Sequence, residues 1–405
     1  MFTSNKMAVL GGDSFRDEYS LAFDGTNDYM IVADAASLSF DAFSSVGWIK
    51  LGEATSCPII TKGIYNTSAE YAIKLQSDDK LHFWVADESV SSCHIGRATP
   101  VLTSYEGQWI HFACTYDGGT ASSGLKIYIN GSQVDDANDE GNAGSFVAME
   151  DLAADVHIAR YGTSASASNF GGLSISDLAI YDKELTQGEV LNVYNGREPF
   201  NHKTSAFSGN LTAWWRMGDG TGDNYEYINN EATGYSLSNN LVVGTDTTFA
   251  GSGNWTGGGG GSVTPNYDSG DAGHDTTLRI EAGSVHTDRA VLAQSNLSST
   301  TVAGQVYLVT FWFKHIEITD RTDDAFIVIG NHQKQNIPRT ASGWTYYKGY
   351  FTAVDNSTDI LVYVNGTDGH ADNETLIDDF SIQKIGSNAG TSVNMASNDM
   401  TGDTP

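Results

Sequence analysis

Residues 71–85 read YAIKLQSDDKLHFWV, and this stretch carries the pattern that decides the fold of the first half of the chain. Apolar residues alternate with other residues over 71–75 and again over 81–85, and polar turn-forming residues lie between the two runs. Because successive side chains of a strand point to opposite faces, each run can bury one face. The stretch predicts two short β-strands joined by a turn.

The same theme continues over residues 19–194, with turn residues roughly every ten positions. Residues 125–129 alternate in this way, and the dipeptide Asn130-Gly131 follows them directly. This dipeptide best tolerates the positive φ angles of a hairpin turn. We therefore expect an all-β protein made of antiparallel β-sandwiches of the jelly-roll kind, with only short helical turns.

One short helix is predicted after Leu185, where Thr186 can cap the amide of Glu189 and Glu189 can reach back. Gly196 can end this helix. The helix marks a domain boundary near residue 200.

Composition limits the class of protein. A chain of 405 residues is long enough for two β-sandwiches, and its 44 glycines and 19 tyrosines suit short strands joined by tight turns. The formal net charge of -29 repels nucleic acids and anionic membrane surfaces, so neither is an expected partner. No run of about 20 apolar residues and no secretory signal pattern is present, so we expect no membrane span. Three cysteines without C-x-x-C spacing are expected to be buried or free thiols.

Several segments resemble, in order, the laminin-G-like branch of the concanavalin A-like lectin and glucanase superfamily. The resemblance spans about 180 residues and implies a jelly roll over residues 16–200 after an N-terminal arm, 1–15. The segments that carry it are Leu21 to Gly25, Asp28-Tyr29, Phe43 to Trp48, Ile60 to Gly63, Trp109 to Ala113, Tyr116 to Gly118, Tyr128 to Gly131 and Gly171 to Tyr181.

Residues 201–240 read as a linker, but they contain Trp214 to Gly220, WWRMGDG, which resembles the opening strand of a further laminin-G-like unit. The tail, 388–405, contains GTSVNM at 390–395, which resembles the continuation of that strand. Our hypothesis is that a second domain is inserted here, with residues 213–215 and 393–395 close in space.

Residues 241–387 are expected to form a second jelly roll that resembles carbohydrate-binding modules of families 4 and 9. Three segments carry this resemblance: Val309 to Lys314, Gly343 to Thr352 and Ile377 to Ile382. The predicted strands are 278–280, 306–314, 326–329, 344–352, 360–364 and 376–382.

A search for paired carboxylates on one strand face, as in enzymes that cleave glucans, finds no suitable pair. Glu317 and Asp320 have a spacing that sends them to opposite faces. A cluster at Asp135, Asp136, Asp139 and Glu140 is interpreted as a solvated loop. No Gly-x-Ser-x-Gly elbow accompanies the histidines. The prediction is a protein without catalytic residues.

Calcium is the one candidate cofactor, in a structural role, because hard carboxylate oxygens suit this ion. Laminin-G-like domains often hold calcium at the rim, and in the modules that the second part resembles an acidic strand residue contributes to a calcium site. The alternative is that these aspartates cap turns, or that a buried one is satisfied by backbone amides. The candidates are Asp24, Asp28, Asp117, Asp378 and Asp379.

Sugar recognition needs exposed aromatic rings beside polar hydrogen-bonding groups. Most tryptophans of β-sandwiches lie in the core, and Trp84 and Trp312 are the preferred exposed candidates. Asn331, His332 and Gln333 follow a predicted strand and can add polar contacts.

The whole arrangement resembles structural proteins of marine tailed phages that carry laminin-G-like domains. This resemblance implies a virion decoration or fibre protein that binds glycans, assembled in the host cytoplasm and displayed on the virion surface, or alternatively an extracellular protein. Other virion proteins and further copies of the chain are the implied partners. The arms 1–16 and 387–405 are predicted to contact neighbouring subunits. Two alternatives remain: a purely structural scaffold without a sugar site, and a glycan-degrading enzyme or its accessory subunit.

Overall fold

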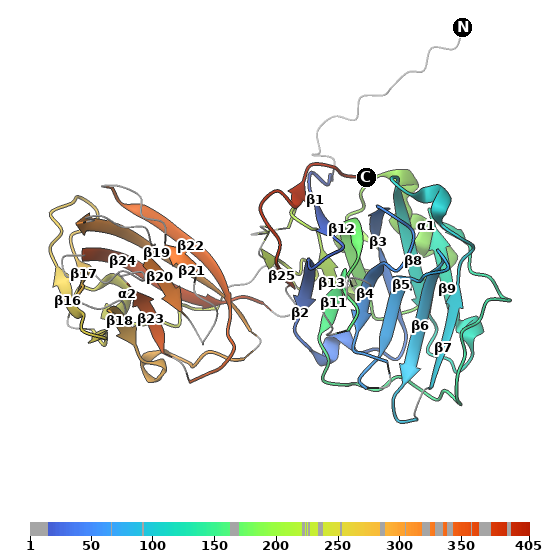
Figure 1. The fold of residues 1–405 in the computed structure, drawn as a ribbon, viewed down its shortest axis with the longest axis horizontal. Coiled ribbons are helices and arrows are strands. Elements are labelled where there is room, and N and C mark those ends of the chain that lie inside the picture. Colours follow the sequence, from blue (N-terminus) through green and yellow to red (C-terminus); the bar gives the residue numbers. More distant parts are fainter. Residues whose placement is uncertain are drawn as a thin grey trace, which may run out of the picture. The chain divides into compact units, whose positions relative to one another are not determined.

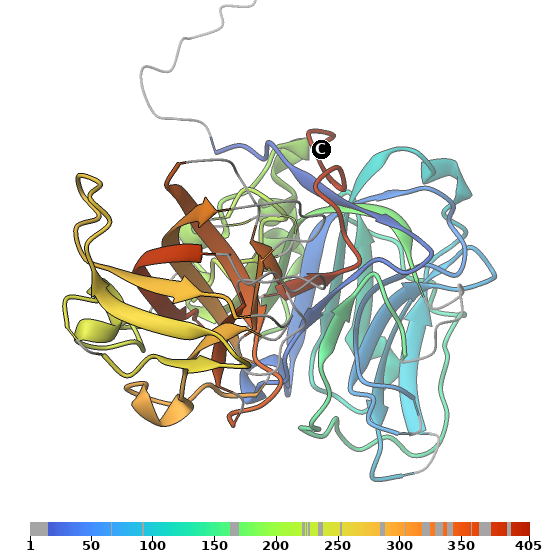
Figure 2. The same ribbon diagram turned by 60° about the vertical axis from the view of Figure 1, so that its left-hand side comes forward.

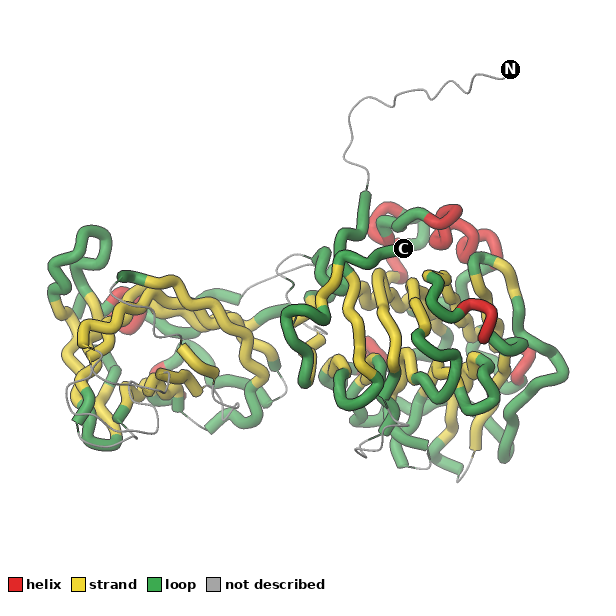
Figure 3. The backbone as a smooth tube through the Cα atoms, turned by 45° about the horizontal axis from the view of Figure 1, so that its top comes forward, coloured by secondary structure: helices red, strands yellow, loops and turns green. Residues whose placement is uncertain are grey.

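The computed structural model is mainly β, as the alternating pattern predicts, and its helices are few and short (Figure 3). The chain divides into two compact units, Met1–Gly234 together with Gly390–Pro405, and Tyr235–Ala389. The structure describes residues 15–65, 67–90, 93–162, 170–220, 223, 225, 227–233, 238–251, 253–283, 288–303, 305–317, 325–328, 335–337, 343–357, 359–363, 374–386 and 390–405.

The first unit is a sandwich of two eight-stranded antiparallel sheets (Figure 1). In the first sheet the order is β10-β9-β8-β3-β12-β1-β26, and β13 also pairs with β12. Its strands are β1 Ser20–Asp24, β3 Phe43–Leu51, β8 Trp109–Tyr116, β9 Leu125–Ile129, β10 Ser132–Gln133, β12 Gly172–Tyr181, β13 Leu211–Trp215 and β26 Met400–Thr401.

The second sheet has the order β14-β25-β2-β11-β4-β5-β6-β7. Its strands are β2 Tyr29–Val32, β4 Pro58–Lys62, β5 Tyr71–Leu75, β6 Leu81–Asp87, β7 Cys93–Ala98, β11 Val156–Ile158, β14 Tyr227–Ile228 and β25 Gly390–Val393. The predicted strand pair of 71–85 is confirmed as β5 and β6, with Ile73 opposite Phe83. Both side chains are fully buried, and the core ring of Phe43 from the first sheet packs edge-on against Phe83 with ring centroids 5.7 Å apart.

Two segments fold as their local sequence predicts. Helix α1, Gln187–Tyr194, starts with a reciprocal capping box between Thr186 and Glu189. It ends at Asn195, which takes the left-handed conformation just before Gly196. Asn130 and Gly131 both have positive φ, at 50° and 76°, and join β9 to β10 as a hairpin.

The other helical segments among the described residues are single turns. They are η1 Ala36–Leu38, η2 Thr103–Tyr105, η3 Ser122–Gly124, η5 Asn195–Arg197, η6 His202–Thr204 and η7 Ser208–Asn210 in the first unit, and α2 Thr245–Thr248 and η8 Gln294–Asn296 in the second.

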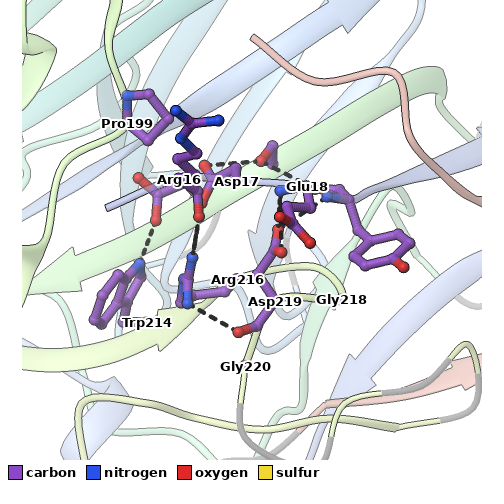
Figure 4. A network of polar contacts seen from close by, with 12 residues as sticks. Arg16, Asp17, Glu18, Pro199, Trp214, Arg216, Gly218, Asp219 and Gly220 are labelled. Atoms are coloured by element: carbon purple, nitrogen blue, oxygen red, sulfur yellow. Dashed lines mark hydrogen bonds and ion pairs between the residues drawn. The ribbon is translucent and has the colours of Figure 1, made fainter. Parts of the chain in front are cut away.

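Arg216, directly after β13, ties the start of the described chain to the first unit (Figure 4). Its guanidinium donates to the carbonyl of Arg16 at 2.7 Å and to Asp17 Oδ1 at 3.1 Å. The carboxylate of Asp219 accepts from the amides of Glu18 and Tyr19 at 3.0 Å. The WWRMGDG segment therefore belongs to the first unit rather than to a separate linker.

The second unit is inserted between two paired strands of the first. Ile228 of β14 pairs with Gly390 of β25, and the residues of the second unit lie between them in sequence. The predicted proximity of 213–215 and 393–395 as strand partners is wrong, because β13 pairs with β12 in the first sheet, whereas β25 pairs with β2 and β14 in the second. The insertion itself is present, with different partners.

The C-terminal segment packs on its own chain. β26 pairs with β1, and Asp403 accepts hydrogen bonds from Lys50 Nζ at 2.7 Å and Trp109 Nε1 at 3.1 Å. This packing within the first unit counts against the prediction that residues 390–405 contact neighbouring subunits. Residues 1–14 of the N-terminal arm lie outside the described residues.

The second unit is also a sandwich, of two five-stranded sheets (Figure 2). The sheet orders are β15-β18-β23-β20-β21 and β16-β17-β24-β19-β22. Aromatic side chains such as Phe311 and Phe380 fill the core between them, with ring centroids 5.3 Å apart. The strands are β15 Thr256–Gly258, β16 Ser262–Tyr267, β17 Thr277–Glu281, β18 Arg289–Leu292, β19 Val306–Glu317, β20 Ala325–Val328, β21 Gln335–Ile337, β22 Thr345–Thr352, β23 Ile360–Tyr363 and β24 Glu374–Lys384.

The three cysteines are free and buried, as expected from their number and spacing. In the described part of the chain, no helix combines the length and apolarity that a membrane crossing requires.

A buried histidine makes the first unit sensitive to acid. His111 on β8 packs against Trp48, and burial, followed by the nearby His202, lowers the pKa of His111 to about 3. The unfolded chain takes up this proton below about pH 6.5, while the folded chain resists it until about pH 3. The stability that the neutral ring contributes is therefore complete above pH 6.5 and is lost as the pH falls.

We expect His111→Phe to make the unfolding free energy less dependent on pH between pH 7.5 and 5, by up to about 1.4 kcal/mol per pH unit. Urea unfolding at both pH values measures this. His157, whose pKa burial and Arg160 lower to about 4, continues to contribute acid sensitivity in the variant. An identical pH dependence of wild type and variant would contradict the prediction.

Candidate functional site

A hollow of about 170 Å³ lies on the face of the second sheet that points away from the core of the first unit. Phe83 and Ile73 point into the core, so the alternating positions Lys74, His82 and Trp84 point outward. The described residues that line the hollow are Tyr65, Lys74, Gln76, His82, Phe83, Trp84, His94, Gly96, Arg97, Gly141 and Tyr161.

Three aromatic rings form the apolar part of the hollow. The ring of Trp84 meets those of Tyr65 and Tyr161 nearly at right angles, with centroids 5.8 and 6.4 Å apart. Gly96 lies opposite Trp84 on β7, where a Cβ atom would come within 2.9 Å of the Trp84 Cβ, so glycine leaves room for the indole. Trp84 is only 9% exposed, because these neighbours cover it. The prediction of an exposed Trp84 is therefore wrong, although the ring does line a hollow.

Polar groups complete the lining. The Tyr65 hydroxyl and His94 Nδ1 are 2.9 Å apart, and burial lowers the pKa of His94, which keeps the ring neutral at pH 7. Lys74 Nζ lies 4.0 Å from the centre of the Tyr161 ring, a cation–π arrangement. Burial also lowers the pKa of Lys74. The side chain of Gln76 adds an amide.

The acidic groups near this hollow are engaged by basic residues. Asp78 binds His82 Nε2 at 3.0 Å, and Arg97 binds Asp135 at 2.6 Å and Glu140 at 3.2 Å. The acidic cluster interpreted as a solvated loop is thus partly structural, because the Asp135 side chain is only 2% exposed and pairs with Arg97.

The second candidate, Trp312, belongs to an aromatic cluster on the second unit. Trp312 on β19 is half-buried and lies opposite Tyr346 on β22, with ring centroids 5.1 Å apart, and Tyr346 is 51% exposed. His274 stacks on Trp344 at 4.0 Å and lies 5.5 Å from Trp312. The pairing across adjacent strands presents these rings on one face of the sheet.

Carboxylates hold this cluster in place. Asp378 is buried and binds His274 Nδ1 at 2.8 Å, and it also accepts from the amide of Asp379 at 2.8 Å. Asp271 accepts from Lys314 Nζ at 2.6 Å and from Trp344 Nε1 at 3.0 Å. The expectation that one of the two adjacent aspartates points inward and finds a partner is confirmed for Asp378, and Asp379 is exposed.

The other polar candidates of the second unit, Asn331, His332 and Gln333, lie outside the described residues, as does Asp320.

The calcium candidates of the first unit do not form one site. Asp24 Oδ1 accepts from the amides of Thr26 and Asn27 at 2.7 and 3.0 Å, which is the turn-capping alternative. Burial and then the charge of Asp24 raise the pKa of Asp28 to about 6, so this pair would favour a cation. Asp117 also caps a turn, because its Oδ1 accepts from the amide of Gly119 at 2.7 Å.

Among the described residues, no group of three or more histidine, cysteine, aspartate or glutamate side chains has the arrangement of a metal site. The acidic candidates therefore offer a cation two carboxylates at most, and calcium stays a prediction.

The sequence did not indicate a buried polar network behind β12. The Tyr181 hydroxyl and His202 Nδ1 are 2.5 Å apart, and His202 Nε2 lies 3.3 Å from Asp177, which also accepts from Trp214 Nε1. The order resembles a catalytic triad, but these side chains are at most 2% exposed. A substrate cannot reach them, so the network stabilises the fold.

Tyr65, His94 and Tyr161 in the first unit and His274 in the second are further site residues that the sequence did not single out. The two tyrosines lie in loops, where no alternation marks an outward side chain. In the sequence, this site is indicated by the hydrophobic run that flanks Trp84.

The comparisons with known proteins show what the first unit is similar to. Residues 24–191 match the model of a family described as the concanavalin A-like lectin/glucanases superfamily. These residues of the first unit are therefore similar to a laminin-G-like domain of this superfamily. Pappalysin-1 of Mus musculus is 27% identical to this chain over an alignment of 245 residues, which covers 55% of this chain and 14% of that protein. The chain thus spans a small part of the length of this relative.

Three solved structures to which the chain is similar share little sequence with it, and their TM-scores are low. A pentraxin from Limulus polyphemus is 16% identical, with a TM-score of 0.33 over 44% of this chain and 82% of its own. A protein from Bacteroides ovatus, named a putative carbohydrate binding protein, is 15% identical to this chain, with a TM-score of 0.35 over 54% of this chain and 56% of its own. A xylan-binding domain from Paenibacillus barcinonensis is 17% identical to this chain, with a TM-score of 0.27 over 34% of this chain and 91% of its own.

Proposed function

We propose that this chain is a non-catalytic carbohydrate-binding protein whose first unit holds a sugar ring in the hollow at Trp84. The observation that carries the proposal is the combination of three aromatic rings with the polar side chains of Lys74, Gln76 and His94 around one hollow. Apolar walls with a few convergent polar groups are the usual form of small-ligand sites. The match of this unit to a superfamily of lectins and glucanases supports the same function.

The chemistry of the hollow favours binding over cleavage. Glycosidases place two carboxyl groups on either side of the scissile bond, one as acid and one as base or nucleophile. The described residues that line the hollow include neither aspartate nor glutamate. The nearby Asp78 and Asp135 are bound by His82 and Arg97 and are not available as such a pair.

The aromatic cluster of the second unit supports a second sugar contact. Trp312 and Tyr346 offer rings on one sheet face, and Lys314 and Asp271 offer charged groups beside them. We propose that this unit acts as a carbohydrate-binding module, with Tyr346 as its most accessible ring.

The setting of this activity is a further part of the proposal. A display protein on a phage virion, in contact with other virion proteins and further copies of the chain, is supported by the resemblance of the sequence to structural proteins of marine tailed phages. An extracellular location is the alternative. Calcium at Asp24 and Asp28 is supported by two adjacent carboxylates of which one has a raised pKa.

A glycan array probed with the full chain, with and without a calcium chelator, tests the proposal. For the best glycan, Tyr161→Ala is expected to weaken binding about tenfold, because it removes one stacking face worth about 1 kcal/mol and a wall of the hollow. Tyr19→Ala is the matched control, since Tyr19 is 42% exposed on the same unit and does not line the hollow.

Three results would contradict the proposal. Failure to bind any glycan favours the scaffold alternative. Equal binding by the Tyr161 variant places the sugar elsewhere. Hydrolysis of a polysaccharide that a single aspartate or glutamate substitution abolishes would show an enzyme.

A further inference from the structure

The charges around the hollow at Trp84 are unusual for a chain with a formal net charge of -29. Its described lining contains Lys74, His82, His94 and Arg97 and no acidic side chain. A second hollow of about 170 Å³ shares Lys74, Gln76 and Tyr161 with the first, and its described lining is also free of acidic side chains. Basic side chains thus line the hollow, and the nearby carboxylates of Asp78, Asp135 and Glu140 are paired with His82 and Arg97.

Lys74 differs from the other basic residues of the hollow. Arg97 and His82 each bind carboxylates, whereas no ion pair to Lys74 exists among the described residues. Its ammonium rests over the Tyr161 ring, and burial alone lowers its pKa. A partly buried cation without a counter-ion carries a desolvation cost that a bound anion would offset.

We propose that the hollow binds an anionic saccharide, a sugar ring that carries a carboxylate or a sulfate, with the anionic group on Lys74. The inference rests on the proposed function, because it names the class of sugar for the same site. The ring of Tyr161 takes the apolar face of the sugar, the largely covered ring of Trp84 forms part of the wall, and Lys74 and Tyr161 line both hollows.

Two neutral donors support the anionic group. When the Tyr65 hydroxyl donates to His94 Nδ1, the remaining proton of the neutral imidazole lies on Nε2, which is then a donor. The Gln76 amide is the second. Lysine presents a compact charge that suits a carboxylate and a sulfate alike. The volume of about 170 Å³ is below the roughly 300 Å³ at which pockets begin to enclose drug-sized ligands, so we expect one sugar ring or terminal residue.

The test compares charged and uncharged forms of the same saccharide by titration calorimetry with the full chain. One pair is trigalacturonate and its methyl ester, and the other is lactose 3′-sulfate and lactose, which carries no charge. We expect the anionic member of at least one pair to bind at least about tenfold more tightly, because it adds a charged hydrogen bond to Lys74. The pair that shows the difference identifies a carboxylate or a sulfate as the recognised group.

Substitutions then locate the anion. Lys74→Met keeps an aliphatic chain over Tyr161 and is expected to abolish the preference for the charged member, while Lys74→Arg retains it. Lys348→Met is the matched control, because Lys348 also lies over a tyrosine ring, 5.4 Å from that of Tyr350, but on the second unit. Unchanged thermal midpoints exclude unfolding. Rising salt should weaken binding of the anionic member more than that of its neutral partner.

The outcomes separate this inference from the proposed function. Equal binding of charged and neutral members, with weaker binding by Tyr161→Ala, overturns the anionic class and leaves sugar binding in place. A charge preference that survives Lys74→Met overturns the role of Lys74. Failure of all four probes, together with an array that shows no glycan bound, overturns both.

Discussion

Lys62→Met is expected to lower the free energy of unfolding of the first unit by about 3–5 kcal/mol, because it leaves a buried carboxylate without its cation. Lys62 on β4 has no exposed surface, and its ammonium binds Glu70, which is equally buried. It also donates to Asp34 at 2.9 Å and to the carbonyl of Leu152 at 3.0 Å. All of these contacts disappear in the variant.

Glu70 determines the size of this effect. Burial raises the pKa of Glu70 even with Lys62 beside it, and one of its oxygens accepts from the amide of Leu152 at 3.0 Å. Without Lys62 the carboxyl must take up a proton or remain as an unpaired charge. The double variant Lys62→Met/Glu70→Gln should therefore recover part of the lost stability, because a neutral amide costs less to bury.

Urea unfolding followed by tryptophan fluorescence measures the free energy of unfolding of Lys62→Met, of Glu70→Gln and of the double variant, which together form a double-mutant cycle. Lys126→Met is the control, because Lys126 forms a more exposed ion pair with Glu184, and we expect a loss below about 1 kcal/mol there. If Lys62→Met also lowers the free energy of unfolding by less than about 1 kcal/mol, the buried pair of Lys62 and Glu70 does not stabilise the fold as predicted.

Removal of residues 390–405 is expected to lower the melting temperature of the first unit by about 10–20 °C. β25 lies between β14 and β2 in the second sheet, and β26 pairs with β1 in the first. At about 1 kcal/mol for each lost ladder hydrogen bond, the cost is about 5 kcal/mol, and each kcal/mol lowers the midpoint of a domain this large by about 2–4 °C. Calorimetry of the full and truncated chains measures the difference.

The matched control deletes residues 235–389 and joins the ends with a glycine–serine linker. This variant keeps β14 and β25, so its first unit should melt near the wild-type temperature. If the truncation melts as the full chain does, or the linker variant is as unstable as the truncation, the paired strands do not hold the unit together in this way.

Local patterns were enough to predict much of the fold. Alternation over 71–85 and 125–129, the Asn130-Gly131 turn and the capping box at Thr186 each involve residues close in sequence, and each forms as expected. Strand partners are set by packing between distant segments. The sequence therefore suggested an insertion near Trp215 but not that β25 would pair with β2.

The candidate sites were predicted less completely for the same reason. Trp84 and Trp312 have outward positions that alternation identifies, and both lie at sites with further aromatic rings. Whether an outward ring stays exposed depends on loops that cover it, and Tyr65 and Tyr161 come from two loops far apart in sequence. The calcium candidate Asp117 shows the same limit, since its spacing does not reveal that it caps a turn.

The pairing of β14 with β25 also fixes an order of events on the ribosome. Residues 15–233 emerge before their last two strands, and residues 235–389 must be made in between, which takes roughly 8–30 s at bacterial or eukaryotic elongation rates. Throughout this interval the nascent chain presents the unpaired edges of β2 and β14, which can associate with other chains. The domain that begins first is thus completed last, and chaperone capacity or translation speed can decide the yield of native protein.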